Sequence, residues 1–124
     1  EEIYRSCEPA LEKMLRAAEL RSGHLPGGFN ESWEPDNSFV CLTGNAQTAT
    51  CLLIMESTQE EDLRVVSGAA RMIDAIVDQV SDSGAIAGSR PLWGRYMRFR
   101  YPNWAAKYVC DALMDLDERI SREL

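Results

Sequence analysis

The segment SGHLPG at residues 22–27 is echoed by SGAIAG at residues 83–88, about 60 residues further along the chain. A second echo follows each segment, because residues 45–55 resemble residues 103–114 with one gap. Each unit therefore reads as a helix, a Gly-bearing loop and a second helix. One such hairpin cannot bury its apolar stripe alone, so we predict a stacked-repeat architecture.

Apolar residues at three- and four-residue spacing predict the two helices of the first unit. The first is expected over about residues 6–22, and Gly23 is expected to end it. The long loop from His24 to Gly44 follows. Asn45 is then expected to cap a second helix that runs to about Glu56. This helix is apolar on nearly every side late in its course, which predicts that it is buried.

The second unit follows the same plan. A third helix is expected to begin at Ser57 or Thr58 and to end at residues 83–84. Its first turn carries acidic residues that favour the helix dipole, and an apolar stripe follows: Glu60, Glu61, Asp62, then Leu63, Val66, Ala70, Ile73, Val77 and Val80. After a loop over residues 85–102, Asn103 can cap the last helix. Its inward stripe is expected to comprise Ala105, Val109, Ala112, Leu113, Leu116 and Ile120.

No stretch alternates with period two for long enough to predict a sheet. We therefore expect an all-α fold: two helical hairpins, with four main helices and long loops, in one domain over residues 1–124. The internal repeat is expected at about 6–56 and 59–121. The chain does not begin with Met, so we expect it to be the C-terminal part of a longer protein.

The loop GAIAGSRPLWGRY at residues 84–96, followed by YPNWAAK at residues 101–107, resembles sequences of the α/α-toroid group. That group includes terpenoid cyclases, protein prenyltransferase subunits and six-hairpin glycosidases and lyases. The similarity is greatest to uncharacterised bacterial members associated with polysaccharides. It implies that the chain is a segment of an α/α-toroid, since a closed toroid has about six hairpins. The acidic motif of the cyclases and the zinc ligands of the prenyltransferases are not recognisable.

Composition excludes several classes of protein. The 124 residues carry a net charge of −7, which argues against double-stranded nucleic acid or an anionic membrane as a partner. No apolar run is long enough for a membrane span. Four cysteines, with neither a C-x-x-C pair nor a nearby His, predict buried free thiols, no metal site and a cytoplasmic protein. The four cysteines are Cys7, Cys41, Cys51 and Cys110. No motif indicates a cofactor.

A basic and aromatic loop is the main candidate site. No acidic residue lies between Asp82 and Asp111, so this interval carries a charge of +5 against −12 for the remainder. Guanidinium groups pair with carboxylates or phosphates, and aromatic faces stack on sugar rings or cations. An acidic carbohydrate or sugar phosphate is therefore the expected ligand. The candidate ligand-binding residues are Arg90, Trp93, Arg95, Tyr96, Arg98, Arg100 and Tyr101. Alternatively, these side chains only pack on a neighbouring hairpin, or they bind a nucleic-acid single strand.

The first long loop supports a second hypothesis, that the chain is part of an enzyme. Glu31, Glu34 and Asp36 lie near Trp33, with His24 upstream, and two carboxylates can act as general acid and base in glycoside cleavage. The function hypotheses are thus a segment that binds an acidic glycan, a fragment of a carbohydrate-active hydrolase or lyase, and a purely structural repeat. No catalytic residue is assigned on this basis.

Two further expectations concern packing. Two hairpins leave apolar flanks uncovered, so we expect self-association or packing on the rest of the parent chain. Trp104 opens the last helix beside its loop, so we expect it to be largely buried and to anchor that loop, with about 3–5 kcal/mol lost on truncation. Trp93 is expected to be the more exposed of the two.

Overall fold

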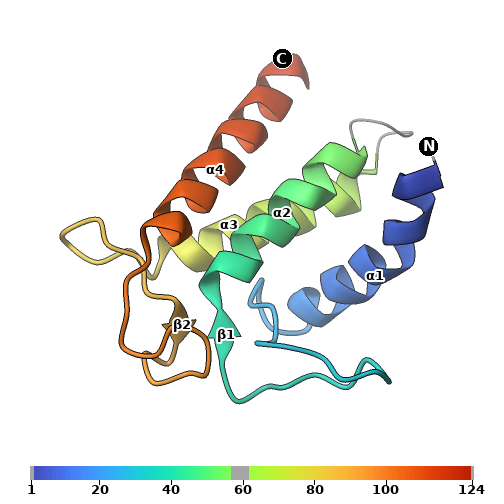
Figure 1. Cartoon of the computed structure of the whole chain (residues 1–124). Coiled ribbons are helices and arrows are strands. Elements are labelled where there is room, and N and C mark those ends of the chain that lie inside the picture. Colours follow the sequence, from blue (N-terminus) through green and yellow to red (C-terminus); the bar gives the residue numbers. More distant parts are fainter. Residues whose placement is uncertain (1, 57–61, 124) are drawn as a thin grey trace.

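The computed structural model describes residues 2–56 and 62–123, which contain four helices and so confirm the all-α class (Figure 1). A short antiparallel ribbon, which the sequence pattern did not predict, joins the two long loops. In chain order the elements are α1 (Glu2–Glu19), β1 (Val40–Cys41), α2 (Leu42–Glu56), α3 (Leu63–Val77), β2 (Ser89–Arg90) and α4 (Asn103–Glu123). Across the described ranges, no helix combines the length and apolar character that a bilayer crossing requires.

Several helix ends differ from their expected positions. The first helix begins at Glu2 and contains Pro9 within its first half. Asn45 lies inside α2 and is not its cap. The side chain of Asp62 caps α3 by accepting a hydrogen bond from the backbone N–H of Arg64 at 2.9 Å. The expected start at Ser57 or Thr58, with Glu60 and Glu61, lies outside the described residues, and Val80 follows the end of α3.

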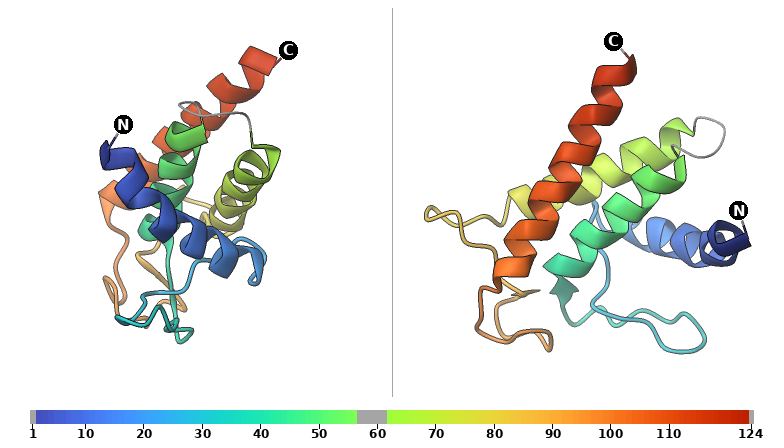
Figure 2. Two further views of the ribbon diagram at one scale, coloured as in Figure 1. Left: turned by 90° about the vertical axis from the view of Figure 1, so that its right-hand side faces the viewer. Right: turned by 45° about the horizontal axis from the view of Figure 1, so that its top comes forward.

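Helix α2 is the centre of the molecule and is buried on most sides, but Cys51 and Ile54 in its later half are exposed, so its predicted burial is confirmed only in part. It packs along α3 and α4, while α1 crosses beside them (Figures 1 and 2). Its lines of contact carry Ala46 and Ala49, both fully buried, which let the neighbouring helices approach closely. One apolar cluster joins α1, α2, α3 and Ala112 of α4, and a second joins α2, α3, α4 and the ribbon.

A single buried amide ties three parts of the chain together. The Oδ1 atom of Asn45 accepts a hydrogen bond from the backbone N–H of Leu25 at 2.6 Å. Its Nδ2 atom donates to the carbonyl oxygens of Gly23 at 2.9 Å and Met72 at 2.8 Å. Asn45 is fully buried. Its side chain therefore holds the end of α1 and the start of the first loop against α3, where water cannot replace the bonds.

A buried ion pair connects the end of α2 to α4. Arg119 donates two hydrogen bonds to the carboxylate of Glu56, at 2.6 and 2.7 Å. The Glu56 side chain is only 1% exposed and that of Arg119 is 12% exposed. Because both charges have left water, the pair persists only while each partner satisfies the other.

Replacing one member of this pair is expected to destabilise the protein. Arg119→Met leaves the Glu56 carboxylate buried without its partner, and we expect a loss of about 2–4 kcal/mol in the free energy of unfolding by urea. The matched control is Arg122→Met, one turn further along α4, which removes an exposed pair with Glu118 and should cost less than about 0.5 kcal/mol. Equal losses for the two variants would contradict this role for the buried pair.

The predicted inward stripe of α4 is only partly correct. Ala105, Val109 and Ala112 are buried as expected, but Leu113 and Ile120 are exposed. Leu113 follows Ala112 by one residue, which turns it about 100° away from the core. With Met114, these side chains leave an uncovered apolar strip on α4. Self-association or packing on a longer chain stays a prediction, and this strip is the surface on which it would occur.

Candidate functional site

The ribbon brings the two long loops together at one end of the molecule, below α2 in Figure 1. Val40 pairs with Arg90 and Cys41 pairs with Ser89. The backbone N–H of Leu42 also donates to the carbonyl oxygen of Gly88 at 3.2 Å. Because Arg90 pairs with Val40, the backbone position of Arg90 is set by the first loop as well as by the second loop, to which it belongs.

Close backbone contacts hold the second loop. The hydroxyl of buried Ser89 donates a hydrogen bond to the carbonyl oxygen of Tyr96. The backbone N–H of Gly88 donates to the carbonyl oxygen of Arg100 at 3.0 Å. A Cβ atom on Gly94 would lie 2.7 Å from that of Ser89 and 2.8 Å from that of Phe39, so the two loops meet where no side chain fits.

Trp104 is not the buried anchor that was expected. It is 42% exposed, and its Nε1–H donates to the hydroxyl of Tyr96 at 3.0 Å. It therefore contacts its own loop from the surface, while Ser89 and Gly94 occupy the interior. Trp93 is 64% exposed, so the prediction that it is the more exposed of the two is confirmed.

The predicted site residues are mostly exposed on the second loop, and we call this set the basic aromatic face. Its members are Arg90, Trp93, Arg95, Arg98, Arg100 and Tyr101, all exposed, and Tyr96, which is half-buried. Arg95 lies 3.6 Å from the carboxylate of Asp36 on the first loop. Within the described residues, the other three arginines have no carboxylate within ion-pair distance. Phe99, 63% exposed on the same loop, adds an aromatic side chain that the sequence analysis left out of the site.

A pocket of about 320 Å³ lies between the two loops, beside this face. Arg21 donates to the Oδ1 atom of Asn37 at 2.6 Å, and Nδ1 of His24 lies 3.1 Å from the carbonyl oxygen of Arg21. Arg21 Nε and His24 Nε2 are buried without a hydrogen-bond partner. Arg21 was not predicted as a site residue, since no local pattern in the sequence distinguishes it from the other helix-end cations. The lining residues are Arg21, His24, Asn37, Ser38, Phe39, Val40, Arg90 and Pro91.

The acidic residues of the first loop have separate surroundings. Glu31 is exposed, and Glu34 accepts a hydrogen bond from Asn30. The hydroxyl and backbone N–H of Ser38 donate to Asp36 and lower its pKa, with a smaller contribution from Arg95. A carboxylate held ionised in this way is a poor general acid at neutral pH. None of the three lines the pocket between the loops.

Trp33 of the same loop is occupied by structural contacts. Its ring stacks at 5.3 Å on Phe29, and the ammonium of Lys13 lies 4.9 Å from its ring centre. The loop thereby folds back on α1.

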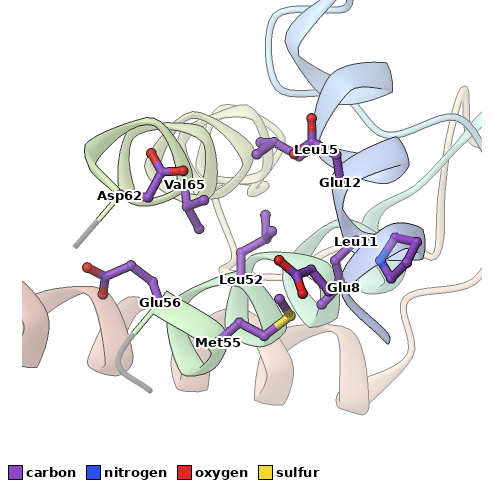
Figure 3. Close-up of a pocket in the computed structure, with 10 residues that line it drawn as sticks. Glu8, Leu11, Glu12, Leu15, Leu52, Met55, Glu56, Asp62 and Val65 are labelled. Atoms are coloured by element: carbon purple, nitrogen blue, oxygen red, sulfur yellow. The ribbon is translucent and has the colours of Figure 1, made fainter. Parts of the chain in front are cut away.

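A larger hollow of about 460 Å³ lies among α1, α2 and α3 (Figure 3). Three of the four carboxylates that line it, those other than Glu8, serve structural roles. Glu56 pairs with Arg119, Asp62 caps α3, and Glu12 pairs with Arg64 and Arg16, which lower the pKa of Glu12. Arg64 also pairs with Glu19, so these ions join α1 to α3.

The cysteines are free, but the prediction that they are buried is wrong for three of them. Cys7, Cys51 and Cys110 are exposed, and Cys41 is half-buried. Desolvation raises the pKa of the Cys41 thiol, and it also raises that of Cys51, with a smaller effect of Cys7. Both thiols are therefore weak nucleophiles at neutral pH. In the described part of the chain, no three His, Cys, Asp or Glu side chains gather to hold a metal ion.

Comparisons of the chain with protein-family models, with curated proteins and with solved structures found no match. The basic aromatic face and the pocket beside it are therefore the features of this chain that indicate a function.

Proposed function

We propose that this protein binds an acidic carbohydrate or a sugar phosphate on the basic aromatic face. The observation that supports this proposal is the exposure of Arg90, Arg98 and Arg100, which have no carboxylate partner among the described residues, on the same loop as exposed Trp93. Structural arginines usually hold acidic partners, as Arg64 and Arg119 do in this molecule. Unpaired guanidinium groups are available for the carboxylates or phosphates of a ligand.

The loop presents Trp93 as a stacking surface. The backbone N–H of Gly94 donates to the carbonyl oxygen of Pro91 at 2.8 Å, which closes a turn with Trp93 at its third position. The turn directs this ring outward, because Gly94 behind it fits tightly against Ser89 and Phe39. A sugar ring stacked on the indole would have charged partners on either side along the chain, at Arg90 and Arg95.

A purely structural role is the second candidate, and the exposed strip of Leu113, Met114 and Ile120 on α4 favours it. In that case the segment packs within a longer toroid, as its resemblance to that group implies. The hydrolase or lyase alternative has less support, because Glu31, Glu34 and Asp36 share no described pocket with Trp93.

Truncation of Trp93 tests the binding proposal. Trp93→Ala should raise the Kd for oligogalacturonate at least tenfold, which corresponds to about 1.4 kcal/mol, because the stacking surface is lost. Its free energy of unfolding should change by less than about 1 kcal/mol, since the ring is mostly exposed. Isothermal titration calorimetry measures the first quantity, because it does not need the indole as a reporter, and urea denaturation measures the second. Binding should weaken as salt screens the arginines.

Two controls accompany this experiment. Trp33→Phe changes a tryptophan away from the face and should leave the Kd unchanged. Trp104→Ala should cost about 1–2 kcal/mol of stability, less than a buried aromatic would. Equal fluorescence responses to oligogalacturonate and to a neutral glucan, or no response to either, would refute acidic-carbohydrate binding on this face.

A further inference from the structure

We infer that the pocket between the two loops captures the acidic group of a single sugar unit, at the end of the ligand that the basic aromatic face binds. This inference rests on the proposed function for its ligand class, and it adds Arg21 and His24 to the site. The recognised chemistry is one anionic group, a carboxylate or a phosphate, on one monosaccharide.

The first support is the charge of the pocket. Arg21, His24 and Arg90 approach it from the end of α1, the first loop and β2, respectively, and no carboxylate lines it. Asp36 is the acidic residue next in sequence to the lining residue Asn37, and its carboxylate contacts Ser38 and Arg95. Two segments far apart in the chain, residues 21–24 and Arg90, thus supply basic groups to one small volume, and nothing among its lining residues neutralises them.

The second support is a pair of unsatisfied nitrogen atoms. Arg21 Nε is always a donor, and it is buried without an acceptor. His24 Nε2 is likewise buried without a partner. Neither atom is accessible to solvent, and leaving a buried polar group unpaired carries a free-energy cost. A small rotation of these side chains toward an anion in the pocket would offset that cost.

The hydrogen bonding of His24 adds to this argument. Its Nδ1 faces the carbonyl oxygen of Arg21, which can only accept, so Nδ1 carries the proton. The unpaired Nε2 is then the ring atom left for a ligand. Asn37 accepts a hydrogen bond from Nη1 of Arg21 at 2.6 Å, which leaves Nε of Arg21 for a ligand.

Size and position limit the ligand to one sugar unit. A volume of about 320 Å³ is at the lower end of the range for small-molecule sites, roughly 300–1,000 Å³. Pro91 lines the pocket, and Trp93 follows two residues later on the exposed turn. A terminal acidic sugar in the pocket therefore places the next unit of an oligosaccharide near the ring of Trp93.

The chain contains one histidine, so its imidazole is a unique probe of the pocket. We would record the ¹H–¹³C and ¹H–¹⁵N correlation signals of His24 while adding D-galacturonate, inorganic phosphate or, as the neutral control, D-galactose. The expected result is a saturable shift with galacturonate, phosphate or both, and none with galactose. A response to one anion only identifies the source of the acidic group.

Variants separate the pocket from the rest of the face. Arg90→Gln and Arg21→Gln should each raise the Kd obtained from the His24 shifts at least tenfold. Arg98→Gln, outside the pocket, should raise this Kd less than threefold. Arg90 is exposed, so its variant remains informative if Arg21→Gln fails to fold.

Two outcomes would overturn the inference, and they are distinguishable. Suppose that oligogalacturonate changes the tryptophan fluorescence but no anion shifts the His24 signals. Anion capture in the pocket is then refuted, and the proposed function survives. If neither probe responds, both are refuted. Equal shifts with galactose and galacturonate would also exclude anion capture.

Discussion

Gly23→Ala is expected to remove most of the folding stability of this protein, about 4 kcal/mol or more. A Cβ atom on Gly23 would lie 2.2 Å from the carbonyl oxygen of Arg71 and 2.7 Å from its carbonyl carbon. Both atoms belong to the backbone of α3 and cannot rotate away as a side chain would. The φ of +87° adds conformational strain of about 1–2 kcal/mol for any L-residue. Relieving the overlap requires moving the end of α1 away from α3.

Gly84 is a matched control, because it occupies the equivalent position in the second SG segment. Its φ is +81°, yet a Cβ atom there would meet nothing within 4 Å. Gly84→Ala should therefore lose only the conformational strain, about 1–2 kcal/mol. Urea denaturation of the two variants measures the difference. Similar losses at the two glycines would show that contact with Arg71 is not what requires glycine at position 23.

Asn45→Ala should cost about 3–5 kcal/mol in the free energy of unfolding. The substitution removes three buried hydrogen bonds at once and leaves the N–H of Leu25 and the carbonyl of Gly23 without these partners. The cost is dominated by groups left unpaired in the core, where each contributes about 1–3 kcal/mol. The carbonyl of Met72 also lies within α3, so its share is smaller.

The control for Asn45 is Gln47→Ala, another amide on the same helix. Gln47 is exposed, so its removal should change the stability by less than about 0.5 kcal/mol. Hydrogen exchange supplies a second readout, since the N–H of Leu25 should lose protection in Asn45→Ala alone. Retained protection of Leu25 would contradict the role assigned to the buried amide.

Particular residues show how far the sequence predicted this molecule. The four helices, the burial of α2 and the glycine at the end of α1 followed from the spacing of apolar residues and from Gly23. The outward positions of Leu113 and Ile120 did not, because an apolar pattern indicates a helix without indicating how much of it neighbours cover. The exposed thiols of Cys51 and Cys110 differ from expectation for the same reason. The internal repeat and the toroid resemblance stay predictions.

Trp104 shows a similar limit within the candidate site. A large aromatic side chain at the start of a helix is a reasonable anchor by composition. The space behind the loop is instead filled by Ser89, Gly94 and Phe39, which meet through the β1–β2 ribbon. Two strands of two residues each are too short to leave a periodic pattern in the sequence.

The sequence by itself determined three properties of this protein: its helical class, the +5 interval and the greater exposure of Trp93 than of Trp104. Each depends on residues that are close in the chain, because periodicity, net charge and turn formation are local properties. The pocket that unites Arg21, His24 and Arg90 was not. Arg21 and Arg90 are far apart in the chain, and they meet only because the ribbon pairs Val40 with Arg90 and the amide of Asn45 holds Gly23 and Leu25 in place. Hydrogen bonds between distant segments position these side chains, and such bonds form only once the helices have packed.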